Sequence, residues 1–344
     1  MNLFRCGLAV ALAAVIVAPP PVLGQGLMVT GYADFEANFT SIDADNSNFF
    51  FDNHHFNLIL IGDVVKDLYV AGEVEYEHAG EEIALEYAYF GYTGIKNLRI
   101  MAGKFIVPFG RFNKDLHPTI INKMPDRPHG FSNVLPQTYN DVGLWVSGTA
   151  PLNMGGTRVV WDGYIVNGLM GDDGGNIRDG RDNDRESRSG ERDDNKAVGA
   201  RLGLELAKQG VDFGVSVYRG NFSNDATLNL DLTLIGADAA FRHKGLELRG
   251  EVVHADQEAT AGDLSKTGGY LQAAYMVTPK WEPVVRYSMR NFDGESDDLS
   301  RLSFGLNFYV QPASSIRVAY HKNMEESGFE VDNDAIVAQW NVLF

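Results

Sequence analysis

From residue 27 onward, apolar and polar side chains alternate in segments of about ten residues, and Gly, Asn, Asp and Pro separate the segments. A period of two puts successive side chains on opposite faces, so the pattern predicts β-strands along the whole chain. The sixteen predicted strands are residues 27–40, 50–61, 68–78, 83–92, 98–107, 139–149, 157–167, 197–206, 211–219, 230–242, 246–255, 269–277, 281–292, 299–310, 315–322 and 335–344.

The connections between these segments alternate in length. Those after even-numbered strands are short, and those after odd-numbered strands are mostly long and polar, with 79–82 as the exception. An up-and-down barrel in an outer membrane has tight turns at one end and long loops at the other. A soluble sandwich has no reason to sort its loops in this way. We therefore predict an all-β fold, a transmembrane antiparallel β-barrel of about sixteen strands that occupies residues 25–344.

Charged side chains share one face of several predicted strands, and such a face needs water. The interior is therefore expected to be a wet lumen, too wide for side chains to fill. Carboxylates on one wall and arginines on the other would create a transverse field that orders dipolar solutes. The predicted lumen wall consists of Glu73, Glu75, Glu77 and Glu86, facing Arg158, Arg201, Arg249, Arg286, Arg290, Arg301 and Arg317.

The first 24 residues have the composition of a signal peptide. A positive charge at Arg5 precedes an apolar run over residues 7–18, and three prolines follow it. The run is too short to span a bilayer, so we expect cleavage before Gln25; a retained anchor is the alternative. The final strand ends in Phe344 and resembles the sorting signal that the outer-membrane assembly machinery reads. Export to the bacterial outer membrane is the predicted localisation.

Loss of residues 1–24 leaves 28 basic and 46 acidic residues, a net charge of about −18. This charge argues against nucleic acid as a partner, because no basic surplus remains to contact phosphates. The one cysteine, Cys6, leaves with the signal, which removes disulfides and thiol catalysis. Actively powered barrels of about 22 strands are excluded by length.

One segment carries a family resemblance. The strand and turn at Lys104-Phe105, Pro108-Phe109-Gly110 are followed by a loop rich in Pro and Arg and by a strand with Gly143 and Trp145. This arrangement resembles the phosphate-selective porin O/P family. The resemblance implies a sixteen-stranded, commonly trimeric barrel whose third outer loop, residues 108–138, folds into the lumen and narrows it.

The same resemblance implies that basic residues of this loop line the constriction. Here Arg111, Lys114, Lys123 and Arg127 outnumber Asp115 and Asp126, so a local positive field is expected. The alternative is a folded outer lid with no part in the constriction. Apolar residues in and before the loop favour inward packing, because a solvated loop would not need them.

These observations predict a porin for passive diffusion of small hydrophilic solutes, with a preference for phosphate or other small anions. A general or carbohydrate pore is the alternative, because the acidic wall and the overall negative charge oppose strict anion selectivity. In that case Phe109, Phe112, Phe131 and Tyr139 would form an aromatic slide; otherwise they pack the loop.

Other candidate chemistry is weaker. The charged loop 168–196 is expected to be solvated, with calcium or lipopolysaccharide binding as alternatives. His54 and His55 are neighbours in a predicted strand and should point to opposite faces, so we expect no shared metal and no cofactor. His78 and His254 lie near strand ends, but no nucleophile is marked by spacing, so no catalytic residues and no enzyme activity are expected.

Overall fold

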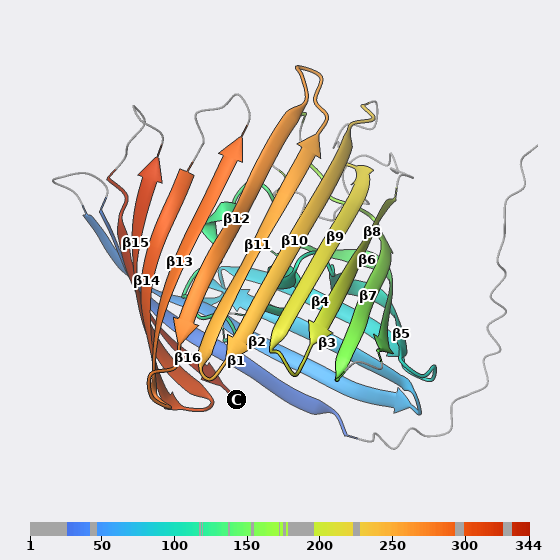
Figure 1. Cartoon of the computed structure of the whole chain (residues 1–344), viewed down its shortest axis with the longest axis horizontal. Helices are drawn as coiled ribbons and strands as arrows, with labels where there is room; N and C mark the ends of the chain where they lie inside the picture. Colours follow the sequence, from blue (N-terminus) through green and yellow to red (C-terminus); the bar gives the residue numbers. More distant parts are fainter. Residues whose placement is uncertain are drawn as a thin grey trace, which may run out of the picture.

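The computed structural model describes residues 26–41, 47–116, 118, 120–136, 138–152, 155–171, 173–174, 177, 196–222, 228–292, 299–325 and 332–344. These residues form sixteen antiparallel strands in one closed barrel, each paired with its sequence neighbours, and the first paired with the last (Figure 1). The sixteen-stranded barrel predicted from the alternation is confirmed. The predicted signal peptide, 1–24, lies outside the described residues.

The strand bounds follow the predicted segments within a few residues. They are β1 Met28–Ser41, β2 Ser47–Val65, β3 Leu68–Glu77, β4 Glu82–Tyr92, β5 Leu98–Ile106, β6 Asn140–Pro151, β7 Thr157–Val166, β8 Ala197–Leu206, β9 Val211–Asn221, β10 Asp231–His243, β11 Leu246–Gln257, β12 Leu264–Tyr275, β13 Trp281–Phe292, β14 Leu299–Gln311, β15 Ser314–Glu325 and β16 Ala335–Leu343. The C-terminus lies at the end of the barrel where the short turns gather (Figure 1).

The turn between β10 and β11 is among the tightest at this end. β10 ends at His243 and β11 begins at Leu246, so two residues connect them. Lys244 and Gly245 both have positive φ, 46° and 85°. Two consecutive positive φ values are what a two-residue hairpin with the right-handed twist of its strands requires.

The barrel is polar inside and apolar outside. Phe213, Val215 and Val217 of β9 are exposed on the outer surface, whereas Glu73 and Glu75 of β3 are buried inside. A soluble protein shows the reverse, so the outer belt matches a lipid environment. Among the described residues, no helix is long and apolar enough to cross a membrane.

The alternation of β2 is interrupted by a β-bulge. Asp34 of β1 is opposite His55, but Glu36 is opposite Asp52, so β2 contains one residue more than β1 over this stretch. The rings of His54 and His55 lie 3.9 Å apart, and both side chains approach Asp34. The expectation that these histidines point to opposite faces is therefore wrong, because the extra residue shifts the parity of the strand.

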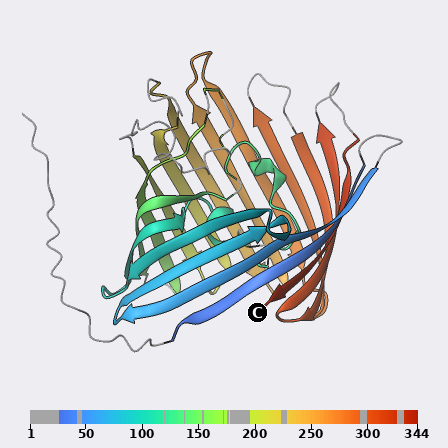
Figure 2. The same cartoon turned by 180° about the vertical axis from the view of Figure 1, so that it is seen from behind.

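Residues 107–139 connect β5 to β6, and we call them the β5–β6 loop. It contains the helical turns η2 Phe112–Leu116 and η3 His129–Phe131. In both views the loop lies between the β1–β5 side and the β9–β14 side of the barrel (Figures 1 and 2). Its described residues contact the inner faces of β7, β9, β11 and β13 to β16.

An apolar cluster fills the space between the β5–β6 loop and the inner faces of β7 to β12. Phe109, Phe112, Phe131 and Tyr139 are buried within it, with at most 3% of each side chain exposed. The cluster also contains Leu169 and Ile177. The beginning of the loop 168–196 is thus packed instead of solvated; residues 178–195 lie outside the described part of the chain.

Candidate channel-lining site

The first part of the β5–β6 loop is held to the barrel wall through its own backbone N–H groups. Glu251 Oε2 of β11 accepts hydrogen bonds from the backbone N–H groups of Arg111, at 3.0 Å, and Phe112, at 2.8 Å. The N–H of Gly110 donates to Ser216 Oγ of β9 at 3.0 Å. A carboxylate that accepts two backbone donors fixes the path of the chain at this point.

Three of the four basic residues predicted to line the constriction are neutralised by carboxylates of the barrel wall. Arg111 Nη2 lies 3.0 Å from Oδ2 of Asp212, at the start of β9. Lys114 forms an ion pair with Asp162 of β7, and Lys123 forms one with Glu282 of β13. The wall, and not Asp115 or Asp126, supplies these partners. Pairs this close leave little net field for a passing anion.

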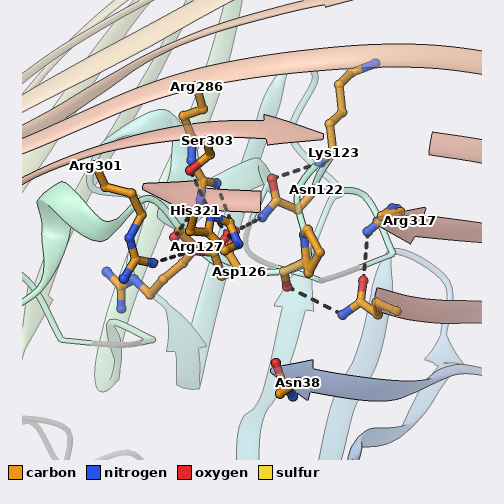
Figure 3. Close-up of polar contacts among 12 residues, drawn as sticks. Asn38, Asn122, Lys123, Asp126, Arg127, Arg286, Arg301, Ser303, Arg317 and His321 are labelled. Atoms are coloured by element: carbon orange, nitrogen blue, oxygen red, sulfur yellow. Dashed lines mark hydrogen bonds and ion pairs between the residues drawn. The ribbon is translucent and has the colours of Figure 1, made fainter. Parts of the chain in front are cut away.

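Asp126 is surrounded by the basic side chains of Arg286, Arg301 and His321, on β13 to β15 (Figure 3). Its carboxylate lies 2.5 Å from Arg286 Nη2, 3.0 Å from Arg301 Nη1 and 3.7 Å from His321 Nε2. Burial raises the pKa of the Asp126 carboxyl, but Arg286, His321 and Arg301 outweigh burial and hold that pKa below its usual range. Asp126 is therefore ionised at neutral pH and anchors the tip of the loop.

Positive charge is in surplus around this carboxylate. Arg286 and Arg301 both face the single charge of Asp126. Arg127 of the loop donates to the backbone oxygen of Pro136 at 2.8 Å, and the guanidinium of Arg290 lies 5.6 Å from the centre of the Phe292 ring. Burial, with the nearby charges of Arg301 and Arg290, lowers the pKa of the loop residue His129 to about 3. We call Arg127, Arg286, Arg290 and Arg301 the arginine cluster.

Further contacts fix the tip of the loop to the wall. They are Arg249 Nη2 to Asn122 Oδ1 at 3.1 Å, Arg317 Nη2 to Ile120 O at 3.0 Å, Asn307 Nδ2 to Lys123 O at 3.1 Å and Gln339 Nε2 to Pro125 O at 3.4 Å. The loop is thus bonded to strands from β11 to β16, so its path across the interior is determined at several points.

The predicted acidic wall lies on the inner faces of β3 and β4. Asn57 Nδ2 of β2 bridges Glu73 Oε1 and Glu75 Oε2, at 2.7 and 2.8 Å. Asn140 Nδ2 donates to Glu86 Oε2 at 3.2 Å, and Glu77 lies beside His55. This wall is negative, opposite in sign to the arginine cluster.

Two of the predicted wall arginines are paired with carboxylates far from the cluster. Arg201 Nη2 of β8 lies 2.6 Å from Asp238 Oδ2 of β10, and both side chains are buried. Arg158 at the start of β7 pairs with Glu205 and is more than half exposed. Their charges are compensated locally, so they add little to the field across the interior.

Ser303, His321 and Asp126 form a chain of contacts that resembles a hydrolytic triad. Ser303 Oγ lies 2.8 Å from His321 Nδ1, and Asp126 lies on the other side of the ring. Ser303 is fully buried and His321 is 2% exposed, so a substrate cannot reach the hydroxyl. Asp126 also forms ion pairs with Arg286 and Arg301. We therefore infer that these contacts position the loop.

Sequence reasoning missed the carboxylates that hold the loop. Glu251 and Glu282 have the inward parity of their strands, so the alternation could have identified them. The predicted wall contains only the arginines of those strands, because carboxylates are expected on the opposite wall alone. Pairing between strands and a loop more than a hundred residues away has no signal in local spacing.

A closed barrel with a charged interior, an apolar outer belt and an internal loop is a channel of the outer membrane. The chain belongs to the Gram-negative porin family, which matches residues 9–327. It is 24% identical over 318 residues to an uncharacterised protein of Aquifex aeolicus, covering 79% of this chain and 70% of that protein. The protein is located in the bacterial outer membrane. The narrower phosphate-selective O/P assignment stays a prediction.

Solved structures share the fold at low identity. The anion-selective porin from Comamonas acidovorans has a TM-score of 0.67 at 13% identity, over 93% of this chain and 99% of that one. The Vibrio cholerae outer-membrane protein OmpT, in its trimer form, has a TM-score of 0.59 at 10% identity, over 93% of this chain and 100% of that one.

Proposed function

We propose that this porin is a passive channel for small hydrophilic solutes, narrowed by the β5–β6 loop, and that it prefers small anions, phosphate among them. The observation that carries the proposal is the arginine cluster. Two arginines, Arg286 and Arg301, contact one ionised carboxylate, Asp126, whereas Arg111, Lys114 and Lys123 are each compensated by the wall. Net positive charge beside the loop tip raises the local concentration of anions.

The acidic wall of β3 and β4 is expected to reduce the preference for anions. Glu73 and Glu75 repel anions, so the two walls together create a transverse field and only a moderate net selectivity. The name of the Comamonas acidovorans porin describes that protein as anion-selective, which is consistent with the proposal for this chain. An aromatic slide for carbohydrates needs rings that are exposed to the passage. The four candidates are buried instead: Phe109, Phe112, Phe131 and Tyr139.

Replacement of Arg290 and Arg301 by glutamine is expected to abolish the anion preference. Two unit charges at about 4 Å in a water-like medium each contribute about 1 kcal/mol, or roughly a fivefold change in anion partition. Reversal potentials across a chloride salt gradient, measured at low ionic strength to limit screening, report this change. Inorganic phosphate in the bath should reduce chloride current in the native channel only.

The matched control is Lys66→Gln, which removes one positive charge in the exposed β2–β3 turn. Its reversal potential should equal that of the native channel. A native channel that prefers cations, or a double variant with an unchanged reversal potential, would refute the proposed anion preference and leave a general nutrient pore.

We further propose a homotrimer, by likeness to the trimer form of Vibrio cholerae OmpT. The exposed phenylalanines Phe35, Phe39, Phe49 and Phe51 on β1 and β2 offer an apolar surface for a neighbouring copy. Light scattering of the detergent-solubilised protein should give three chains per particle, and the Phe35→Ser with Phe51→Ser variant should shift the particle toward single barrels. A native particle of one chain would contradict the trimer.

Two partners of the assembled protein remain proposals. Phe344 pairs with Gly31 of β1 through backbone hydrogen bonds, and its ring stacks on Phe56 at 5.6 Å. The terminal residue thus lies at the seam where β16 meets β1, a suitable position for recognition by the barrel assembly machinery. The long outer loops are proposed to contact lipopolysaccharide.

A further inference from the structure

The β-bulge in β2 brings two histidines to one carboxylate on the inner face of the barrel. His55 Nδ1 lies 3.0 Å from Asp34 Oδ2, and His54 Nδ1 lies 3.7 Å from Asp34 Oδ1. His54 Nδ1 also lies 3.1 Å from Glu36 Oε1. An uninterrupted strand would send one of the two rings to the lipid face, so the bulge is what creates this cluster.

The separations in the cluster suit a bound metal ion. One potential ligand atom from each of Asp34, His54 and His55 can be chosen so that all lie within 4.8 Å of one another. In a tetrahedral site with bonds of about 2.1 Å, ligand atoms lie about 3.4 Å apart. The distances of 3.0 and 3.7 Å from the histidine nitrogens to Asp34 bracket that spacing.

The side chains around the cluster are those that support metal ligands. His55 Nε2 lies 3.5 Å from Glu77 Oε1 of β3, so a ring that binds metal through Nδ1 can donate its other N–H to a carboxylate. Glu36 Oε1 accepts a hydrogen bond from Gln339 Nε2 at 2.7 Å and lies 3.1 Å from His54 Nδ1, at the edge of this group. His54 Nδ1 is buried and makes no hydrogen bond with any described residue, although carboxylates are close.

We propose that Asp34, His54 and His55, with Glu36 as a fourth ligand, bind a divalent transition-metal cation of the zinc type. Two imidazole nitrogens with carboxylate oxygens favour such ions over calcium or magnesium, which prefer oxygen ligands. Two carboxylates balance the charge of the dication, and the 22% exposed side chain of His54 leaves a route from the lumen. A bound cation adds positive charge to the acidic side of the channel.

The competing explanation is that protonated histidines form simple ion pairs with Asp34 and Glu36. Isothermal titration calorimetry of the purified, folded protein in detergent with Zn²⁺ at pH 7.5 distinguishes metal binding from these ion pairs. We expect one Zn²⁺ per chain, and at least a tenfold weaker affinity in His54→Gln and in His55→Gln. His243→Gln, which removes an exposed imidazole at the end of β10, serves as the matched control and should bind as the native protein does.

Absence of Zn²⁺ binding by the native protein, or equal affinity in the native protein and in both histidine variants, would overturn the proposal. Displacement of Zn²⁺ by millimolar Ca²⁺ would also overturn it, because it would indicate an unspecific carboxylate site. Heat-modifiable migration on gels verifies that each variant is folded. Because His54 is partly exposed, His54→Gln is the variant expected to disturb the fold least. The measurement needs no membrane, so its result is independent of the proposed anion preference.

Discussion

The Gly130→Val variant is expected to lose the docked position of the β5–β6 loop and to conduct more current than the native channel. A Cβ atom at Gly130 would lie 2.1 Å from the backbone oxygen of Gly269 and 2.4 Å from that of Met289. Backbone atoms of two strands cannot move aside cheaply. Overpacking of this kind costs about 3 kcal/mol, which shifts the docking equilibrium by more than a hundredfold.

Single-channel recordings in planar bilayers measure the effect as a larger unitary conductance with more frequent fluctuations. Gly163→Ala on β7 is the matched control, because a Cβ atom there meets nothing within 4 Å. If Gly130→Val kept the native conductance, the loop would not be the element that narrows the passage, and the proposed constriction would be wrong.

Acidification from pH 7.5 to pH 4.5 is expected to release the loop, through His129. Its pKa in the docked loop is about 3, against an ordinary value of 6.5, because burial and the charges of Arg301 and Arg290 disfavour the protonated ring. The released loop therefore binds a proton below pH 6.5 that the docked loop cannot bind. Docking is fully favoured above pH 6.5 and is weakened about tenfold per pH unit from there down to about pH 3.

The difference between native and His129→Gln channels isolates this effect, since other groups titrate equally in both. Glutamine binds no proton, so the variant should retain one conductance level at pH 4.5, where the native channel leaves its level frequently. Asp126 does not interfere in this interval, because its pKa is below the ordinary 3.8 in the docked loop. Identical pH responses of the two channels would exclude His129 as the responsive group.

The barrel could be predicted from the sequence because its two determinants are local. Alternation within each segment is imposed by the contrast between lipid and water, and the sorting of connections by length is imposed by the membrane. Residues such as Glu73 and Arg286 were placed on the inner face by parity alone, and they are buried there. Parity predicts the wrong face for one of the two histidines His54 and His55, because the one inserted residue in β2 has no signal in the amino-acid composition.

The electrostatics of the interior depend on pairs that parity cannot identify. Arg111 and Lys123 were expected to offer their charge to solutes, but Asp212 and Glu282 compensate them. Which cation meets which carboxylate depends on the path of the loop through the interior, and that path is set by packing of Phe109 and Phe131 and by Gly130 against β12. The arginine cluster depends on this path, and local sequence carries no signal for it.

The partners of the β5–β6 loop also determine when the passage acquires its final shape. The loop is synthesised early, yet Asp126 is bonded to Arg286 and Arg301, and Ile120 accepts from Arg317, 197 positions later in the chain. Contacts at such separation form late, because a long segment must be ordered first. Until β13 and β14 are in place, the carboxylate of Asp126 lacks the counter-charges of Arg286 and Arg301. The filter is consequently completed only after these late strands have formed, so a barrel that stops before them would conduct without selectivity.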